Sequence, residues 1–234
     1  MSNKTRITWL GHSTVLLQTA HGTNLLIDPF LTGNPSAPKN LLLPEKLDAI
    51  LLTHAHNDHI GDALPLAQKY GATIVAIHEL AVYMAGKGAE QTIGMNLGGS
   101  VVLGDVTATM VEAKHSSSIQ DENGVQDGGV AAGFVLTIKD GITFYHAGDT
   151  NVFGDMKLIG DLYHPQVALL PIGGHYTMGP REAALAVRLL SPQTVLPIHF
   201  GTFPPLTGRP AELAALVDPT VKVVDWHPGD VFEA

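Results

Sequence analysis

Three histidines and one aspartate lie within six consecutive positions of the chain, from His54 to His59. The segment reads His-Ala-His-Asn-Asp-His and directly follows the largely apolar segment 49–53, a predicted strand. If the chain turns tightly there, His54 and His56 point to one side, and Asp58 and His59 point to another. Imidazole nitrogen and carboxylate oxygen are ligands of Zn²⁺, and Mn²⁺ or Fe²⁺ accept the same donors. One short loop is therefore predicted to serve two neighbouring cations.

Three further residues of ligand type come at the ends of apolar runs that are typical of strands. His115 follows Lys114 at the end of one run, Asp149 comes shortly after a second, and His199 ends a third. Rigid sheets place functional side chains in the loops at strand ends, so these residues are candidates to complete a metal centre. Asp28 also ends an apolar run. It is predicted to hold a ligand imidazole or the loop of ligands in place, the alternative being an acid that only terminates its strand.

The elements that must position these residues alternate between strands and helices, which indicates a layered α/β architecture. The predicted strands are residues 6–9, 14–18, 24–28, 49–53, 73–77, 100–103, 106–112, 132–138, 143–146, 167–172, 194–198 and 221–225. The predicted helices are residues 62–70, 79–85, 155–162, 181–190 and 211–217. Residues 32–44 and 116–129 are rich in turn-forming or polar residues, and they are predicted as surface loops that border a pocket.

Taken together, these segments resemble the metallo-β-lactamase superfamily over nearly the whole chain. The cluster matches the H-x-H-x-D-H signature of that superfamily, and the later candidate ligands follow in the expected order. The resemblance implies a four-layer αββα sandwich with two divalent metal ions at one edge. Zinc is the expected metal, and manganese or iron are the alternatives. Carried over position by position, it assigns His54, His56 and His115 to one ion, Asp58, His59 and His199 to the other, and Asp149 to both as a bridge.

A centre of this kind implies hydrolysis. Two bound cations lower the pKa of a bridging water from 15.7 toward ~7, so hydroxide becomes available at neutral pH. The expected activity is a metal-dependent hydrolase that uses this metal-bridging hydroxide on a small ester, lactone or phosphodiester. Asp58 is assigned a second, catalytic role as a proton acceptor.

Two further segments resemble a branch that contains ascorbate-6-phosphate lactonase-like proteins and small metal-dependent hydrolases. The segment 8–14 contains His12, which is predicted as a substrate contact or as a hydrogen-bond donor to a ligand; the alternative is a polar residue at a strand bend. The segment 171–179 contains the pair Gly173-Gly174 and then His175. A glycine pair lets the backbone approach closely, so His175 is predicted as a general acid or oxyanion partner above the metals.

Composition limits the partners. The chain has 234 residues, 45% of them hydrophobic, and its 13 basic and 22 acidic residues give a net charge of −9. One hydrophobic core serves a chain of this length, so a single domain over residues 1–234 is predicted. The negative charge disfavours nucleic acid and anionic membranes as partners. A small-molecule substrate is expected, and a homo-oligomer is compatible with the sequence.

The chain also lacks the patterns of membrane insertion and secretion. Its longest apolar runs, such as 167–172, fall far short of the ~20 residues that cross a bilayer. Residues 1–6 are polar and carry no leader pattern, so a cytoplasmic protein is expected.

Two other functions use the same ligands. A di-iron redox protein is chemically reasonable, although the chain shows no glycine-rich nucleotide fingerprint for a flavin partner. A non-catalytic metal-binding sensor would bind a metabolite without turning it over.

Overall fold

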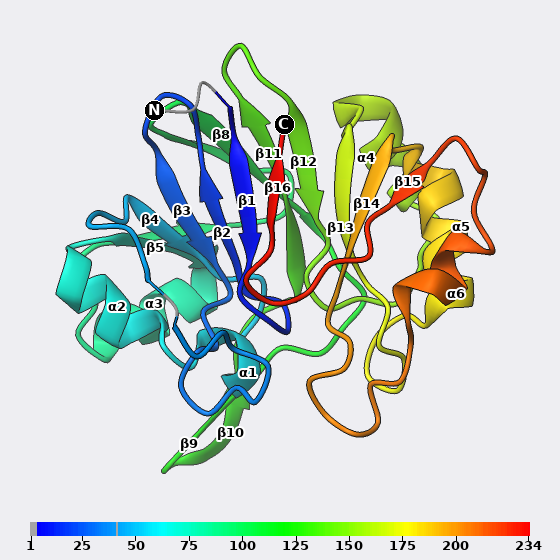
Figure 1. Cartoon of the computed structure of the whole chain (residues 1–234). Helices are drawn as coiled ribbons and strands as arrows, with labels where there is room; N and C mark the ends of the chain where they lie inside the picture. The colour runs from blue at the N-terminus through cyan, green and yellow to red at the C-terminus, as the bar shows by residue number, and fades with distance from the viewer. Residues whose placement is uncertain (1–3, 41) are drawn as a thin grey trace.

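The computed structural model describes residues 4–40 and 42–234. In this part of the chain, two sheets of seven strands each pack face to face. Helices cover the outer face of each sheet, so the molecule has four layers (Figure 1). The predicted αββα fold class is confirmed. Residues 1–3 of the predicted domain, and residue 41 in the predicted loop 32–44, lie outside the described residues.

The first sheet has the order β16-β1-β2-β3-β4-β5-β6, and the second has the order β15-β14-β13-β12-β11-β8-β7. The strands of the first sheet are β1 (Arg6–Trp9), β2 (Val15–Gln18), β3 (Asn24–Ile27), β4 (Ala49–Leu51), β5 (Thr73–Ile77), β6 (Thr92–Met95) and β16 (Val231–Glu233). Those of the second are β7 (Ser100–Leu103), β8 (Val106–Glu112), β11 (Ala132–Ile138), β12 (Thr143–His146), β13 (Val167–Pro171), β14 (Thr194–Ile198) and β15 (Lys222–Val223). A separate hairpin pairs β9 (Ser118–Asp121) with β10 (Gly124–Asp127).

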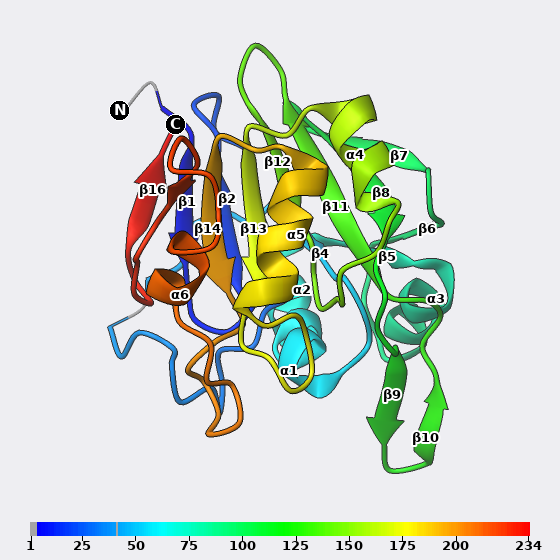
Figure 2. The same ribbon diagram turned by 90° about the vertical axis from the view of Figure 1, so that its right-hand side faces the viewer.

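Six helices complete the described part of the chain. They are α1 (Asn57–Ile60), α2 (Ala63–Tyr70), α3 (His78–Gly86), α4 (Met156–Tyr163), α5 (Pro180–Leu190) and α6 (Pro210–Ala214). The helices α2 and α3 lie on the first sheet, and α4, α5 and α6 lie on the second (Figures 1 and 2). None of them has both the length and the hydrophobicity needed to cross a bilayer.

The central strands of the second sheet, such as β11 and β13, read as nearly continuous apolar runs because both of their faces are buried. In β11, Phe134 and Leu136 belong to the core between the two sheets, whereas Val135 belongs to the core beneath α4 and α5. Side chains of a strand alternate between its faces, so one strand contributes to both cores. These runs are what made the strands predictable.

Five elements were not predicted: α1, β6, β16, and the strands β9 and β10 of the separate hairpin. The hairpin falls where a surface loop was predicted at residues 116–129. All four residues of β10 are exposed, so no apolar face marks it in the sequence. The helix α1 is a single turn within the histidine cluster, and β16 is a three-residue edge strand with two exposed residues.

The strands place the candidate ligands at one edge of the sandwich. Strands β3 and β4 are parallel neighbours in the first sheet, and β12, β13 and β14 are parallel neighbours in the second. Parallel neighbours have their carboxyl ends at the same edge, where the following loops can converge. The loops after these strands meet near α1, at the lower edge in Figure 1.

Gly173 follows β13, and its lack of a side chain lets the His199 backbone pack against it. A Cβ at Gly173 would overlap the His199 carbonyl oxygen and lie 3.1 Å from Leu206 Cβ. We expect Gly173→Ala to lower the free energy of unfolding by about 1–3 kcal/mol, as overpacking does. Urea denaturation measures it. The matched control is Gly154→Ala, where a Cβ meets nothing within 4 Å. Equal unfolding midpoints for the two variants would contradict this expectation.

Candidate metal centre

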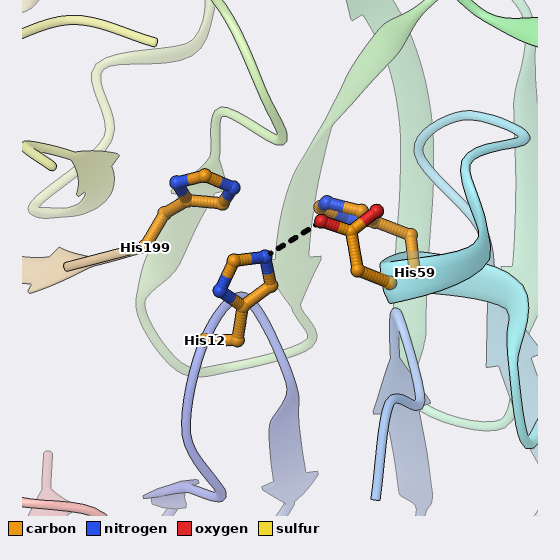
Figure 3. Close-up of side chains that lie close together, drawn as sticks. His12, His59 and His199 are labelled. Atoms are coloured by element: carbon orange, nitrogen blue, oxygen red, sulfur yellow. Dashed lines mark hydrogen bonds and ion pairs between the residues drawn. The ribbon is translucent and has the colours of Figure 1, made fainter. Parts of the chain in front are cut away.

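The structure brings all seven predicted ligands together, and His12 joins them. The potential ligand atoms fall into three groups, and within each group they lie within 4.8 Å of one another: His54, His56 and His115; His12, Asp58, His59 and His199; and His54, His59 and Asp149. The first two groups correspond to the two predicted ion sites, apart from the addition of His12. Figure 3 shows the rings of His12, His59 and His199 facing a shared space.

Asp149 lies at the centre of these groups. Its Oδ2 atom is 3.0 Å from His199 Nε2, 3.4 Å from His59 Nε2 and 3.7 Å from His115 Nε2. Burial alone would raise the pKa of the Asp149 carboxyl, but the charges on His199 and His59 lower it well below its ordinary value. Asp149 is therefore an ionised carboxylate that contacts ligands of both groups, which is the position expected of a bridge.

Asp28 sets the orientation of two ligand rings. Its Oδ2 atom accepts hydrogen bonds from Thr53 Oγ1 at 2.7 Å and from His59 Nδ1 at 2.8 Å. The Thr53 hydroxyl has only one proton, which it donates to Asp28, so its contact with His54 Nδ1 at 3.0 Å must be accepted from that ring. Both histidines thus carry a proton on Nδ1, which leaves Nε2 as the nitrogen that could bind an ion. This is the role predicted for Asp28.

Several buried nitrogen atoms of the cluster make no contact with hydrogen-bond geometry among the described residues, although two of them lie close to Asp149. They are His12 Nδ1, His59 Nε2, and both ring nitrogens of His199. A buried polar atom without a partner costs about 1–3 kcal/mol. Burial alone would lower the pKa of His59, yet the carboxylates of Asp149 and Asp28 raise it well above its ordinary value. The centre therefore holds negative charge that a proton or a cation must balance, and its nitrogen and carboxylate donors fit divalent metal ions.

The turn between β1 and β2 reaches three acidic residues of the centre. His12 Nε2 lies 3.1 Å from Asp58 Oδ2, and Ser13 Oγ donates to Asp149 Oδ1 at 3.4 Å. Thr14 Oγ1 donates to the backbone oxygen of Asp28 at 2.7 Å. Burial lowers the pKa of His12 to about 4, so its ring is neutral and donates its one proton to Asp58.

The backbone of the same turn is fixed on both sides. Gly11 has φ 94°, and a Cβ there would lie 2.9 Å from Ser36 O, so only glycine fits. The His12 carbonyl accepts hydrogen bonds from Trp9 Nε1 and from the His199 backbone N–H, each at 2.9 Å. The turn is therefore rigid and bonded to the loop of a predicted ligand. The positions of Ser13 and Thr14 were not predicted from the sequence.

Ser13 offers a test of this turn. We expect Ser13→Ala to weaken zinc affinity about 10- to 100-fold, because a group that orients a metal-ligating carboxylate is lost. Competition with a chromophoric chelator measures the affinity. Ser100→Ala, in the edge strand β7, is the control and should bind zinc as the wild type does. Equal affinities for wild type and Ser13→Ala would rule out this role.

The donor atoms open into a cavity of about 590 Å³. It is lined by His12, His56, Asp58, His115, Ser116, Asp149, Tyr176, His199, Phe203 and Pro205. His175 does not line this cavity. Its side chain is exposed, and its ring packs edge-on against the Tyr176 ring with centroids 4.4 Å apart. Tyr176, which was not predicted, takes the place at the rim that was expected for His175.

Comparison with known proteins decides the family. Residues 23–200 match the family described as Beta-lactamase superfamily domain. The chain belongs to this superfamily. A UPF0173 metal-dependent hydrolase of Koribacter versatilis is 47% identical over 227 residues, which is 97% of each chain. Its counterpart in Methanopyrus kandleri is 46% identical over 233 residues, 97% of this chain and 99% of the relative.

A solved structure of a similar protein supports the same assignment. Igni18, described as a novel metallo hydrolase from Ignicoccus hospitalis, is 40% identical, with a TM-score of 0.87 over 99% of this chain and 98% of its own. The protein is thus a metal-dependent hydrolase of the metallo-β-lactamase fold. The predicted resemblance to the ascorbate-6-phosphate lactonase-like branch is not confirmed by these relatives.

Proposed function

We propose that this superfamily member is a dinuclear hydrolase that acts on a small ester, lactone or phosphodiester. Zinc is the metal that we favour for both sites. The observation that carries the proposal is the arrangement around Asp149, which lies between two groups of ligand atoms at the base of one cavity. His54, His56 and His115 would hold one ion. Asp58, His59 and His199 would hold the other.

Divalent ions held by these residues would act as Lewis acids that activate water at neutral pH and polarise the attacked group. Asp58 lines the cavity, and its side chain is 35% exposed. Burial alone would raise the pKa of Asp58, but the hydrogen bond with His12 and the charge on His59 lower it. Asp58 is therefore ionised at neutral pH, and its carboxylate is available to accept a proton from attacking water.

The rim of the cavity supplies hydrogen-bond donors to the substrate. The hydroxyl groups of Tyr176 and Ser116 both belong to side chains that line it. We assign Tyr176 the contact with the developing oxyanion or leaving oxygen that was expected of His175. His175 then supports the Tyr176 ring through their edge-on contact.

The cavity supports a small-molecule substrate. Its volume of about 590 Å³ lies within the range of ~300–1,000 Å³ that is usual for small-ligand sites. Phe203 and Pro205 give it one apolar wall beside the polar donors. The net charge of −9 again disfavours nucleic acid as the substrate.

The test combines metal analysis with two assays. Protein purified after growth with zinc or with manganese is analysed for metal, and turnover of bis-p-nitrophenyl phosphate and of a simple lactone is measured in parallel. We expect close to two ions per chain and turnover of at least one substrate. Protein that binds no transition metal under metal-replete conditions contradicts the proposal. Tight binding of a metabolite without turnover of any substrate would indicate a sensor.

A further inference from the structure

A second cavity adjoins the metal cavity. It measures about 910 Å³, and His115 and Ser116 line both cavities. The other residues that line it come from the end of β8, from the hairpin of β9 and β10, and from the segment after the hairpin: Glu112, Ala113, Lys114, Ser117, Ser118, Val125, Gln126, Asp127, Gly129, Val130 and Ala131, with Leu97 beside them. We call this second cavity the hairpin groove. It lies next to the site where the scissile bond is expected, with His115 and Ser116 between the two.

The hairpin groove exposes apolar side chains. Leu97 is 39% exposed, Val125 is 73% exposed and Val130 is 52% exposed. Single exposed apolar residues are common, but several around one groove beside a candidate active site mark a binding surface. Ala113 and Ala131 add buried apolar surface to its lining.

The charged groups in the groove already have partners. Lys114 Nζ pairs with the Glu112 carboxylate. Asp127 Oδ1 accepts a hydrogen bond from the Gly129 backbone N–H at 2.9 Å. Among the described lining residues, the one cation of Lys and Arg type is thus paired and the Asp127 carboxylate keeps its negative charge, so an uncharged ligand fits the groove better than an anionic one.

The hairpin that forms one wall is held at both ends. At its base, Ser117 Oγ accepts from the Ala55 backbone N–H and donates to the Gly128 oxygen, each at 3.2 Å. Near its tip, Lys87 Nζ lies 3.0 Å from Asp121 Oδ2. The hairpin projects beyond the two sheets (Figure 2). These bonds fix it to α3 and to the loop of metal ligands, so the groove is formed before a ligand arrives.

From these observations we propose that the hairpin groove binds an uncharged, apolar arm of the substrate, an alkyl or aryl chain, while the scissile bond lies in the metal cavity. This inference rests on the proposed function for the place of that bond. It narrows the substrate class to esters, lactones or phosphodiesters that carry such an arm. Transfer of each methylene from water into the groove should tighten binding about two- to fourfold.

The experiment measures binding of straight-chain carboxylates, from acetate to decanoate, to the zinc-loaded protein by isothermal titration calorimetry. The carboxylate is the head group for the metal centre, and the chain length probes the groove. We expect Kd to fall about two- to fourfold per added methylene until the groove is filled. Val125→Asp should flatten this dependence, while acetate, which is too short to reach Val125, should bind as in the wild type.

Two matched variants complete the design. Leu162→Asp, at a side chain of α4 that is 69% exposed, changes the same kind of residue outside the groove and should keep the wild-type dependence. Val125→Leu restores an apolar side chain and should also keep it. Both Val125 variants change an exposed side chain, so folding should be preserved, which circular dichroism checks.

Several results would overturn the inference. One is an unchanged chain-length dependence in Val125→Asp, and another is a flat dependence or no carboxylate binding in the wild type. A third is conversion of a dimer to a monomer by Val125→Asp with the dependence intact, which would assign the apolar surface to a second copy of the chain. If short substrates are turned over but the Kd of the carboxylates does not change with chain length, the groove assignment is wrong and the proposed hydrolysis stands. If Kd falls steeply with chain length but no substrate is turned over, the proposed hydrolysis is wrong and the groove assignment stands.

Discussion

Asp149→Asn is expected to lower kcat by at least about 10³-fold and to remove most of the bound metal, because the centre loses the carboxylate that both ligand groups share. Asparagine keeps the shape of the side chain but not its charge. The ionised carboxylate now lies within 3.0 Å of His199 Nε2 and 3.4 Å of His59 Nε2. Metal analysis and turnover of bis-p-nitrophenyl phosphate or a simple lactone measure the two effects.

Two further variants make this result specific. His54→Ala removes one imidazole and leaves Asp58, His59 and His199 in place, so we expect close to one ion per chain and loss of hydrolysis. Asp161→Asn, on α4 and 56% exposed, is the matched control and should keep wild-type metal content and turnover. Retention of two ions and of wild-type turnover by Asp149→Asn would refute the assignment of Asp149 as the bridge.

Removal of metal is expected to lower Tm by about 8–16 °C for each ion lost. A ligand at 1,000 times its Kd stabilises the folded state by about 4.1 kcal/mol, and 1 kcal/mol shifts Tm by about 2–4 °C in a protein of this size. The physical reason is that metal removal would leave the buried Asp149 carboxylate and the imidazoles of His59 and His199 without the cations that neutralise and bind them. Scanning calorimetry with and without dipicolinate measures the shift.

The variant Asp149→Asn again supplies the control for chelation. Its Tm should not respond to dipicolinate, because it holds little metal to remove. An equal Tm for the wild type before and after complete metal removal would show that the centre contributes nothing to stability. A shift of equal size in both proteins would indicate that the chelator itself acts on the fold.

The parts of the fold that the sequence predicted are those with two buried faces. The run at β13 is apolar throughout because one face packs between the sheets and the other under α5, and that pattern can be recognised without coordinates. The β9–β10 hairpin carries one deeply buried apolar residue, Ile119, so it resembled a polar loop. Helix α1 and strand β16 are too short to show a period.

The candidate ligands were predictable because residues 54–59 match the H-x-H-x-D-H signature, and the later ligands follow in the order that the resemblance implies. The residues that hold the ligands in place or line the cavity were harder to predict from the sequence. Ser13 is 136 positions from Asp149 in the sequence, and only the turn between β1 and β2 brings them together. His175 and Tyr176 are neighbours and both are exposed, but only Tyr176 lines the cavity. His175 has φ 59°, a conformation that the sequence of a non-glycine residue does not signal.

Both sheets contribute to the centre, and this determines when it can be completed during synthesis. Asp28 and His54 follow strands of the first sheet, whereas Asp149 and His199 follow strands of the second. A nascent chain that has left the ribosome only through β12 has the histidine cluster but not His199. Occupancy of both ion sites would therefore be a late step of biogenesis, because the two sheets must dock first, and the bound ions would then link ligands from both sheets.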